Sequence, residues 1–111
     1  MRRYHSIAEL IAKLDEPNRT ACARILDEHR TLFETVKGGN NHHVWRGGYL
    51  DHVTDAMNLA VVLHEELGAL RSLPFSLSDL LLVIYLHDLE KPWRFGDRKE
   101  QLAAKESHEG F

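Results

Sequence analysis

The sequence predicts an all-α fold, a compact bundle of about five helices, on three observations. Apolar residues recur at spacings of three and four in the segments before and after a central loop at residues 38–48. Ser-x-x-Glu and Ser-x-x-Asp patterns precede two of these segments, as they do at helix starts. With 111 residues, the chain is long enough for one modest core, so we expect a single domain over residues 1–111.

Two helices are predicted before the loop. Ser6-Ile-Ala-Glu9 is a capping-box pattern that opens a short first helix. Pro17 suits the first turn of a second helix, predicted to run unbroken over 17–36 and to end at Gly38-Gly39. The apolar faces of these two helices are predicted to consist of Ile7, Leu10, Ile11 and Leu14, then Ala21, Ile25, Leu32 and Val36 with Leu26 and Phe33 beside them.

Two further helices are predicted after the loop 38–48. The third is expected over about 49–67, with Gly68 as its stop. The fourth is expected from the Ser76-Leu-Ser-Asp79 box through about Leu89, because Pro92 cannot continue a helix. The tail 97–111 has weak helical character.

Composition limits the class of function. No apolar stretch approaches the about 20 residues of a membrane span, so no membrane partner is expected. The formal net charge of −3 argues against broad, charge-driven binding of nucleic acid. Cys22 is the only cysteine, which excludes an intramolecular disulfide, fits a reducing cytoplasmic location, and is expected to be a packing residue of its helix.

A His-Asp pair is the strongest functional signal. His87-Asp88 ends the apolar run 80–86, and His52 lies upstream on the third predicted helix. Imidazole and carboxylate groups are costly to bury unless they are paired, hydrogen-bonded or bound to metal. His52 is expected to point inward, because helical spacing places it on one face with Ala56, Leu59, Ala60, Leu63 and Leu67. A shared metal ion is the strongest reason for the three groups to occur together.

These residues resemble the HD superfamily of metal-dependent phosphohydrolases. The segment His42-His-Val-Trp-Arg-Gly-Gly-Tyr-Leu-Asp-His52 is similar to the His-His-x4-Gly-Gly-Leu-Leu-x-His pattern of a branch that includes exoribonuclease-like proteins. The segment Leu86-His-Asp-Leu-Glu-Lys91 resembles the family's His-Asp-Ile-Gly-Lys, with Glu90 at the glycine position. The resemblance covers about residues 42–108 and implies an HD-like helical domain.

The resemblance implies a hydrolase that acts on a nucleotide or related phosphoester through metal-activated water. It makes His52, His87 and Asp88 ligands of a divalent Mn, Fe, Ni, Co or Zn ion. Asp88 would also orient the water, while Lys91 and Arg46 would hold substrate phosphate.

Further residues receive candidate roles near that site. The candidates for a second metal ion or for proton donation are His42, His43 and His108. Trp45 and Trp93 are candidates for stacking on a substrate base, or else lids on the core. The remaining histidines, His5, His29 and His64, are expected on solvated helix faces.

Several alternatives stay open at the level of sequence. The family's fourth ligand is a later aspartate, whereas Asp97 is the only aspartate after Asp88. A truncated or minimal domain, a ligand from a neighbouring subunit in a homo-oligomer, or a shell completed by water and substrate would each account for this. The alternative function is a catalytically inactive HD-fold module that binds a nucleotide or a protein partner, and a weaker one is a plain bundle with structural histidines.

Overall fold

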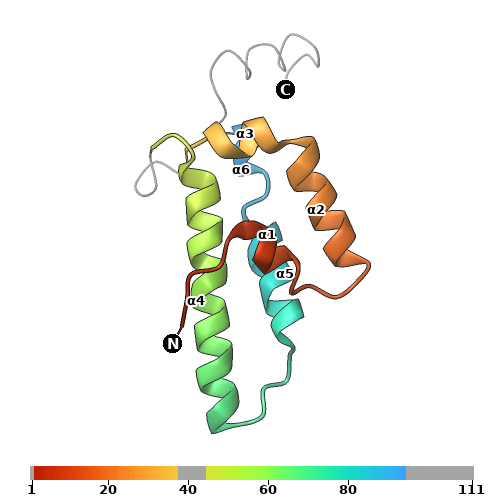
Figure 1. Cartoon of the computed structure of the whole chain (residues 1–111), viewed down its shortest axis with the longest axis vertical. Coiled ribbons are helices and arrows are strands. Elements are labelled where there is room, and N and C mark those ends of the chain that lie inside the picture. The colour runs from red at the N-terminus through yellow and green to blue at the C-terminus, as the bar shows by residue number, and fades with distance from the viewer. Residues whose placement is uncertain (1, 38–44, 95–111) are drawn as a thin grey trace. The chain divides into compact units, whose positions relative to one another are not determined.

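The computed structural model describes residues 2–37 and 45–94, and these confirm the all-α prediction (Figure 1). No strand occurs among the described residues. Their helices are α1 (Ile7–Ile11), α2 (Asn18–Glu28), α3 (Arg30–Thr35), α4 (Gly48–Leu70), α5 (Leu77–His87) and α6 (Lys91–Arg94). Chain contacts divide them into two compact units. The larger unit comprises 2–28 and 53–88, and the smaller unit comprises the described residues of 29–52 and 89–111.

The larger unit is built from α1, α2, α5 and most of α4. In Figure 1, α4 and α5 run in opposite directions and are joined by residues 71–76. Two polar contacts link its parts: the Tyr85 hydroxyl donates to the Cys22 carbonyl at 2.9 Å in a buried bond, and the Asp15 N–H donates to Ser78 Oγ at 2.9 Å in a part-buried one. Its buried apolar residues are Leu10, Ile11, Leu14, Cys22, Leu26, Val53, Met57, Ala60, Val61, Leu81 and Tyr85.

The smaller unit has an aromatic core, in which α3 packs on α6. Phe33 lies edge-to-face with Tyr49 and with Trp93, at ring-centroid distances of 5.4 and 5.9 Å. His29 lies edge-on to Trp93 at 5.0 Å. The Tyr49 N–H donates to the Val36 carbonyl at 3.0 Å, which ties the start of α4 to the end of α3. Such aromatic pairs stabilise the fold by more than the burial of their apolar area alone.

Both predicted serine caps are confirmed. The Ser6 hydroxyl accepts from the Glu9 N–H, and the Glu9 carboxylate accepts from the Ser6 N–H, which completes a capping box. The Ser76 hydroxyl accepts from the Asp79 N–H at 3.1 Å. Cys22 is also buried on α2 as expected.

The prediction of one unbroken helix over 17–36 is wrong. At His29 the backbone leaves the helical region, with φ −121° and ψ 25°, and α3 begins there with the Phe33 N–H donating to the His29 carbonyl. The reason lies in packing, because Cys22 and Leu26 fill the core of the larger unit, whereas Phe33 belongs to the aromatic core of the smaller one. Apolar periodicity continues through the break and therefore does not reveal it.

Two predictions about α4 are also wrong. The helix passes through Gly68 and ends at Leu70, because a glycine lowers helix propensity without forcing a stop. Its predicted inner face is only partly buried: Ala60 is buried as expected, whereas Leu59, Leu63 and Leu67 are exposed at 59%, 49% and 47%. The other apolar residues that α4 buries are Tyr49, Val53, Met57 and Val61. Because α4 carries apolar residues on more than one face, periodicity alone did not identify the buried one.

The helix that carries the His-Asp pair ends slightly earlier than the predicted Leu89. It ends at His87, and Asp88 is its C-cap residue. Pro92 lies in the first turn of α6, a position where its missing N–H costs nothing. Within the described ranges, no helix is both long and apolar enough to span a membrane.

Candidate functional site

His87 and Asp88 form a close pair at the end of α5. Nδ1 of His87 lies 3.2 Å from Oδ2 of Asp88. The two side chains differ in exposure, at 67% for the imidazole and 14% for the carboxylate. A carboxylate this far out of water needs a partner, and the adjacent imidazole is one. The pair therefore places an exposed imidazole beside a largely buried carboxylate.

His52 lies in the first turns of α4 and is half-buried. It belongs to the smaller unit, whereas His87 and Asp88 belong to the larger one. In the part of the chain that the structure describes, no three His, Cys, Asp or Glu side chains gather into a group that would hold a metal ion. The ligand set of His52, His87 and Asp88 therefore remains a prediction.

Trp45 and Arg46 lie in a tight turn that leads into α4. The Gly48 N–H donates to the Trp45 carbonyl at 2.8 Å, and Gly47 has a φ of +79°. A Cβ at Gly47 would lie 3.0 Å from the Glu34 carbonyl oxygen, so both the positive φ and the close approach to α3 require glycine. Gly47, the first glycine of the motif's pair, therefore has a local structural reason.

Asp51 is a neighbour of this turn that sequence reasoning missed. The Trp45 indole N–H donates to Oδ2 of Asp51 at 2.7 Å. The Asp51 N–H donates to the Gly47 carbonyl at 3.1 Å, which places its carboxylate in the first turn of α4. The signal available in the sequence was the position of Asp51, an acidic residue one helical turn after the Gly47-Gly48 pair and six residues after Trp45.

Lys91 and Trp93 both lie on α6, in the smaller unit with Trp45, Arg46 and His52. Lys91 is half-buried, while Arg46 is exposed. Trp93 makes edge contacts with His29 and Phe33, which fits its role as a lid on the aromatic core. His42, His43 and His108 lie outside the described residues, so their predicted roles stay predictions.

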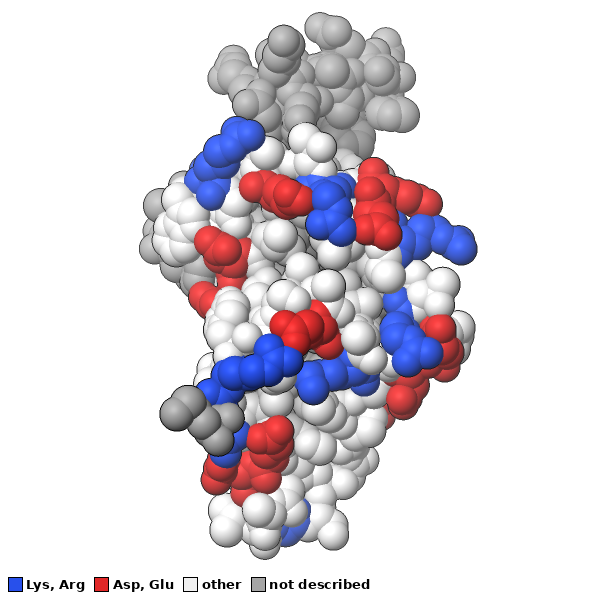
Figure 2. All heavy atoms as spheres, in the orientation of Figure 1, with Lys and Arg blue, Asp and Glu red and all other residues white. Residues whose placement is uncertain are grey.

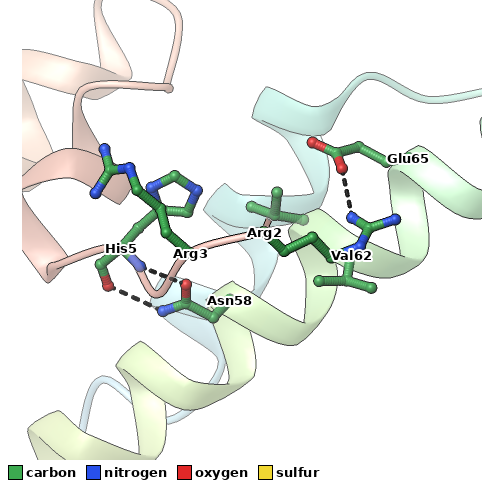
Figure 3. Close-up of a pocket in the computed structure, with 7 residues that line it drawn as sticks. Arg2, Arg3, His5, Asn58, Val62 and Glu65 are labelled. Carbon is green, nitrogen blue, oxygen red and sulfur yellow. Dashed lines mark hydrogen bonds and ion pairs between the residues drawn. The ribbon is translucent and has the colours of Figure 1, made fainter.

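A pocket of about 510 Å³ lies elsewhere in the larger unit (Figure 3). It lies between the N-terminal segment and α4, and none of the predicted site residues is among its described lining residues: Arg2, Arg3, His5, Asn58, Val61, Val62 and Glu65. Its guanidinium groups already have partners, because Arg2 pairs with Glu65 and Glu66 and Arg3 pairs with Glu9. The pocket therefore offers a ligand little uncompensated charge.

The expectation that His5, His29 and His64 lie on solvated helix faces is wrong for His5 and His29, because neither lies within a helix. His5 lies before α1, its side chain is 18% exposed, and its Nδ1 is buried without a hydrogen-bond partner. His29 contacts Trp93 at the break between α2 and α3. His64 is on α4, but its Nε2 lies 3.1 Å from the Phe75 carbonyl oxygen.

The charged side chains of the face drawn in Figure 2 are interspersed by sign. Among the described residues, ion pairs include Arg19 with Glu16 and Arg30 with Glu34, at 3.4 and 3.5 Å. This face presents no large field of one sign that would attract a polyanion.

Comparison with known proteins gives no match to a family model, a curated protein or a solved structure. The resemblance to the HD superfamily thus depends on the residues quoted from the sequence.

Proposed function

We propose that this protein is a metal-dependent phosphohydrolase that acts on a nucleotide or a related phosphoester. The observation that carries the proposal is the His87–Asp88 pair, in which a largely buried carboxylate lies 3.2 Å from an exposed imidazole at the end of an apolar helix. The two adjacent side chains are an imidazole and a carboxylate, both of which are donors to divalent transition-metal ions. The HD-like spacing to His52 adds the third donor.

The donor chemistry fits the proposed ion. Two imidazoles and one carboxylate, from His52, His87 and Asp88, suit a divalent Mn, Fe, Ni, Co or Zn ion better than Mg, which prefers oxygen ligands. Such an ion would activate water near neutral pH and polarise a phosphoryl oxygen.

The other residues act on the substrate. Besides serving as a metal donor, Asp88 would orient the attacking water. Arg46, whose guanidinium is exposed beside the Gly47 turn, holds phosphate oxygens in a bidentate contact. Lys91 supplies a second positive charge that stabilises the negative charge developing on the phosphoryl oxygens.

Loss of metal and activity together tests this proposal. His87→Ala and Asp88→Ala are expected to remove the transition metal found by elemental analysis of purified protein. They should also lower metal-dependent hydrolysis of a phosphoester panel to the level measured with chelator. His64→Ala is the matched control, because this α4 histidine lies beside the Phe75 carbonyl and has no role in the proposed site. Full activity in the His87 and Asp88 variants would contradict the proposal.

A catalytically inactive module that binds a nucleotide or protein partner is the second candidate. It is favoured by Glu90, an exposed carboxylate where the family pattern has glycine. It predicts thermal stabilisation by ligand without turnover. Chelator-sensitive hydrolysis above background would exclude it.

A further inference from the structure

The two tryptophans differ in what surrounds their rings. Trp93 is half-buried and makes edge contacts with His29 and Phe33. Trp45 is 50% exposed, although an indole is among the largest apolar surfaces a protein can leave in water. Of the two tryptophans, Trp45 is the more exposed.

The Trp45 ring is also held in place. Its N–H donates to the Asp51 carboxylate at 2.7 Å, a charge-assisted bond that fixes the edge of the ring. Its backbone is fixed as well, because its carbonyl accepts from the Gly48 N–H and the Gly47 turn packs on α3. An exposed ring with its polar edge already satisfied binds a planar partner at low cost in conformational entropy.

We propose that Trp45 is the surface on which the base of the nucleotide substrate stacks, and that Asp51 is a positioning residue that orients the indole. The inference rests on the proposed function for the choice of a nucleotide. Base stacking on an aromatic side chain suits a ligand with a planar ring. The exposed guanidinium of Arg46, the next residue, suits the phosphate of the same ligand. The ligand class is therefore a nucleoside monophosphate, preferred over the corresponding sugar phosphate.

The test compares two ligands on the full chain in chelator, so that metal and turnover play no part. Calorimetry is expected to give adenosine monophosphate an affinity about tenfold higher than ribose phosphate, the lower range for one stacked base. Trp45→Leu should remove this preference and leave the ribose phosphate affinity unchanged, while Trp45→Phe should keep part of it. Phe75→Leu, which changes a comparably exposed ring in the larger unit, is the control and should keep the full preference.

The role of Asp51 is tested by two variants. Asp51→Ala should reduce the preference for adenosine monophosphate and shift the indole N–H signal of Trp45 in NMR spectra, whereas Asp51→Asn, which keeps an acceptor oxygen, should restore both. Equal signals in all three proteins would overturn the positioning role.

The outcomes separate this inference from the proposed function. Equal affinities for the two ligands, an unchanged preference in Trp45→Leu, or no binding of adenosine monophosphate would each overturn the stacking. Metal-dependent hydrolysis of a phosphoester without a base tests the enzyme independently of Trp45. Base-dependent binding without any hydrolysis would support the stacking and contradict the enzyme.

Discussion

Glu9 illustrates how much one exposed residue contributes to a short helix. Its carboxylate accepts from the Arg3 guanidinium and from the Ser6 N–H. The Arg3 bond first, and then the Ser6 backbone bond, lowers the pKa of Glu9 from 4.5 to about 2. Because the pKa of Glu9 is lower in the folded than in the unfolded state, the ionised carboxylate stabilises the folded state at pH values above the unfolded-state pKa. This stabilisation is lost as the pH falls through the folded-state pKa.

Glu9→Gln is therefore expected to show a pH-dependent loss of stability. Glutamine keeps the capping-box acceptor but not the charge that Arg3 contacts, so the variant should melt below the wild type at about pH 6. The difference in Tm should shrink as the wild-type carboxylate is protonated between about pH 4.5 and about pH 2. Glu28→Gln, which removes another exposed negative charge, is the control. A Tm difference that stays constant over this window would contradict the assignment.

Local chemistry made some residues predictable and left others hidden. Ser6 and Ser76 cap their helices as predicted because a cap depends on residues only three positions away. The contact of Trp45 with Asp51 was not predicted, because it depends on a positive φ at Gly47. Cys22 is buried as expected, and desolvation raises the pKa of its thiol.

At the scale of elements, Asn58 attaches the N-terminal segment to α4 (Figure 3). Its amide bonds both backbone groups of His5: Oδ1 accepts from the His5 N–H at 2.7 Å, and Nδ2 donates to the His5 carbonyl at 2.9 Å. Nδ2 also donates to the Thr54 carbonyl at 2.9 Å. The Asn58 side chain thus satisfies both backbone hydrogen-bonding groups of His5, as the backbone of a neighbouring strand would.

Asn58→Ala is expected to release the segment before α1. Losing these half-buried bonds should lower the free energy of unfolding by about 1–2 kcal/mol, and amide exchange at His5 should accelerate. Asn58→Asp, which keeps an acceptor for the His5 N–H but loses both donations, should fall between the two proteins. Unchanged exchange at His5 in Asn58→Ala would show that other contacts hold the segment.

The helices show where pattern reasoning succeeds and where it fails. Helix type and approximate position follow from periodicity and caps, so α1, α4 and α5 occur where expected. The break at His29 and the buried face of α4 were not predicted, because both depend on which core each apolar residue joins. Leu59 and Met57 are equally apolar in the sequence, but only Met57 is buried.

For the whole molecule, the proposed ion should stabilise the folded chain. A ligand that binds only the native state adds about 2.7 kcal/mol at a concentration about 100-fold above its Kd. Adding Mn²⁺ or Zn²⁺ to chelator-treated protein is therefore expected to raise Tm by several degrees. His52→Ala, His87→Ala and Asp88→Ala should each reduce that rise, whereas His64→Ala should retain it. The same rise in all four variants would place metal binding at other residues.

The sequence by itself determined the helical class and the two serine caps, because both depend on neighbours within one or two helical turns. Only the tertiary structure decided that α2 and α3 are separate helices, which face of α4 is buried, and that Trp45 is anchored by Asp51 while Trp93 joins the aromatic core. The physical reason is that local hydrogen bonds are fixed by spacing along the chain, whereas burial is fixed by which apolar surfaces meet. A chain with apolar residues on several helix faces leaves that choice to packing.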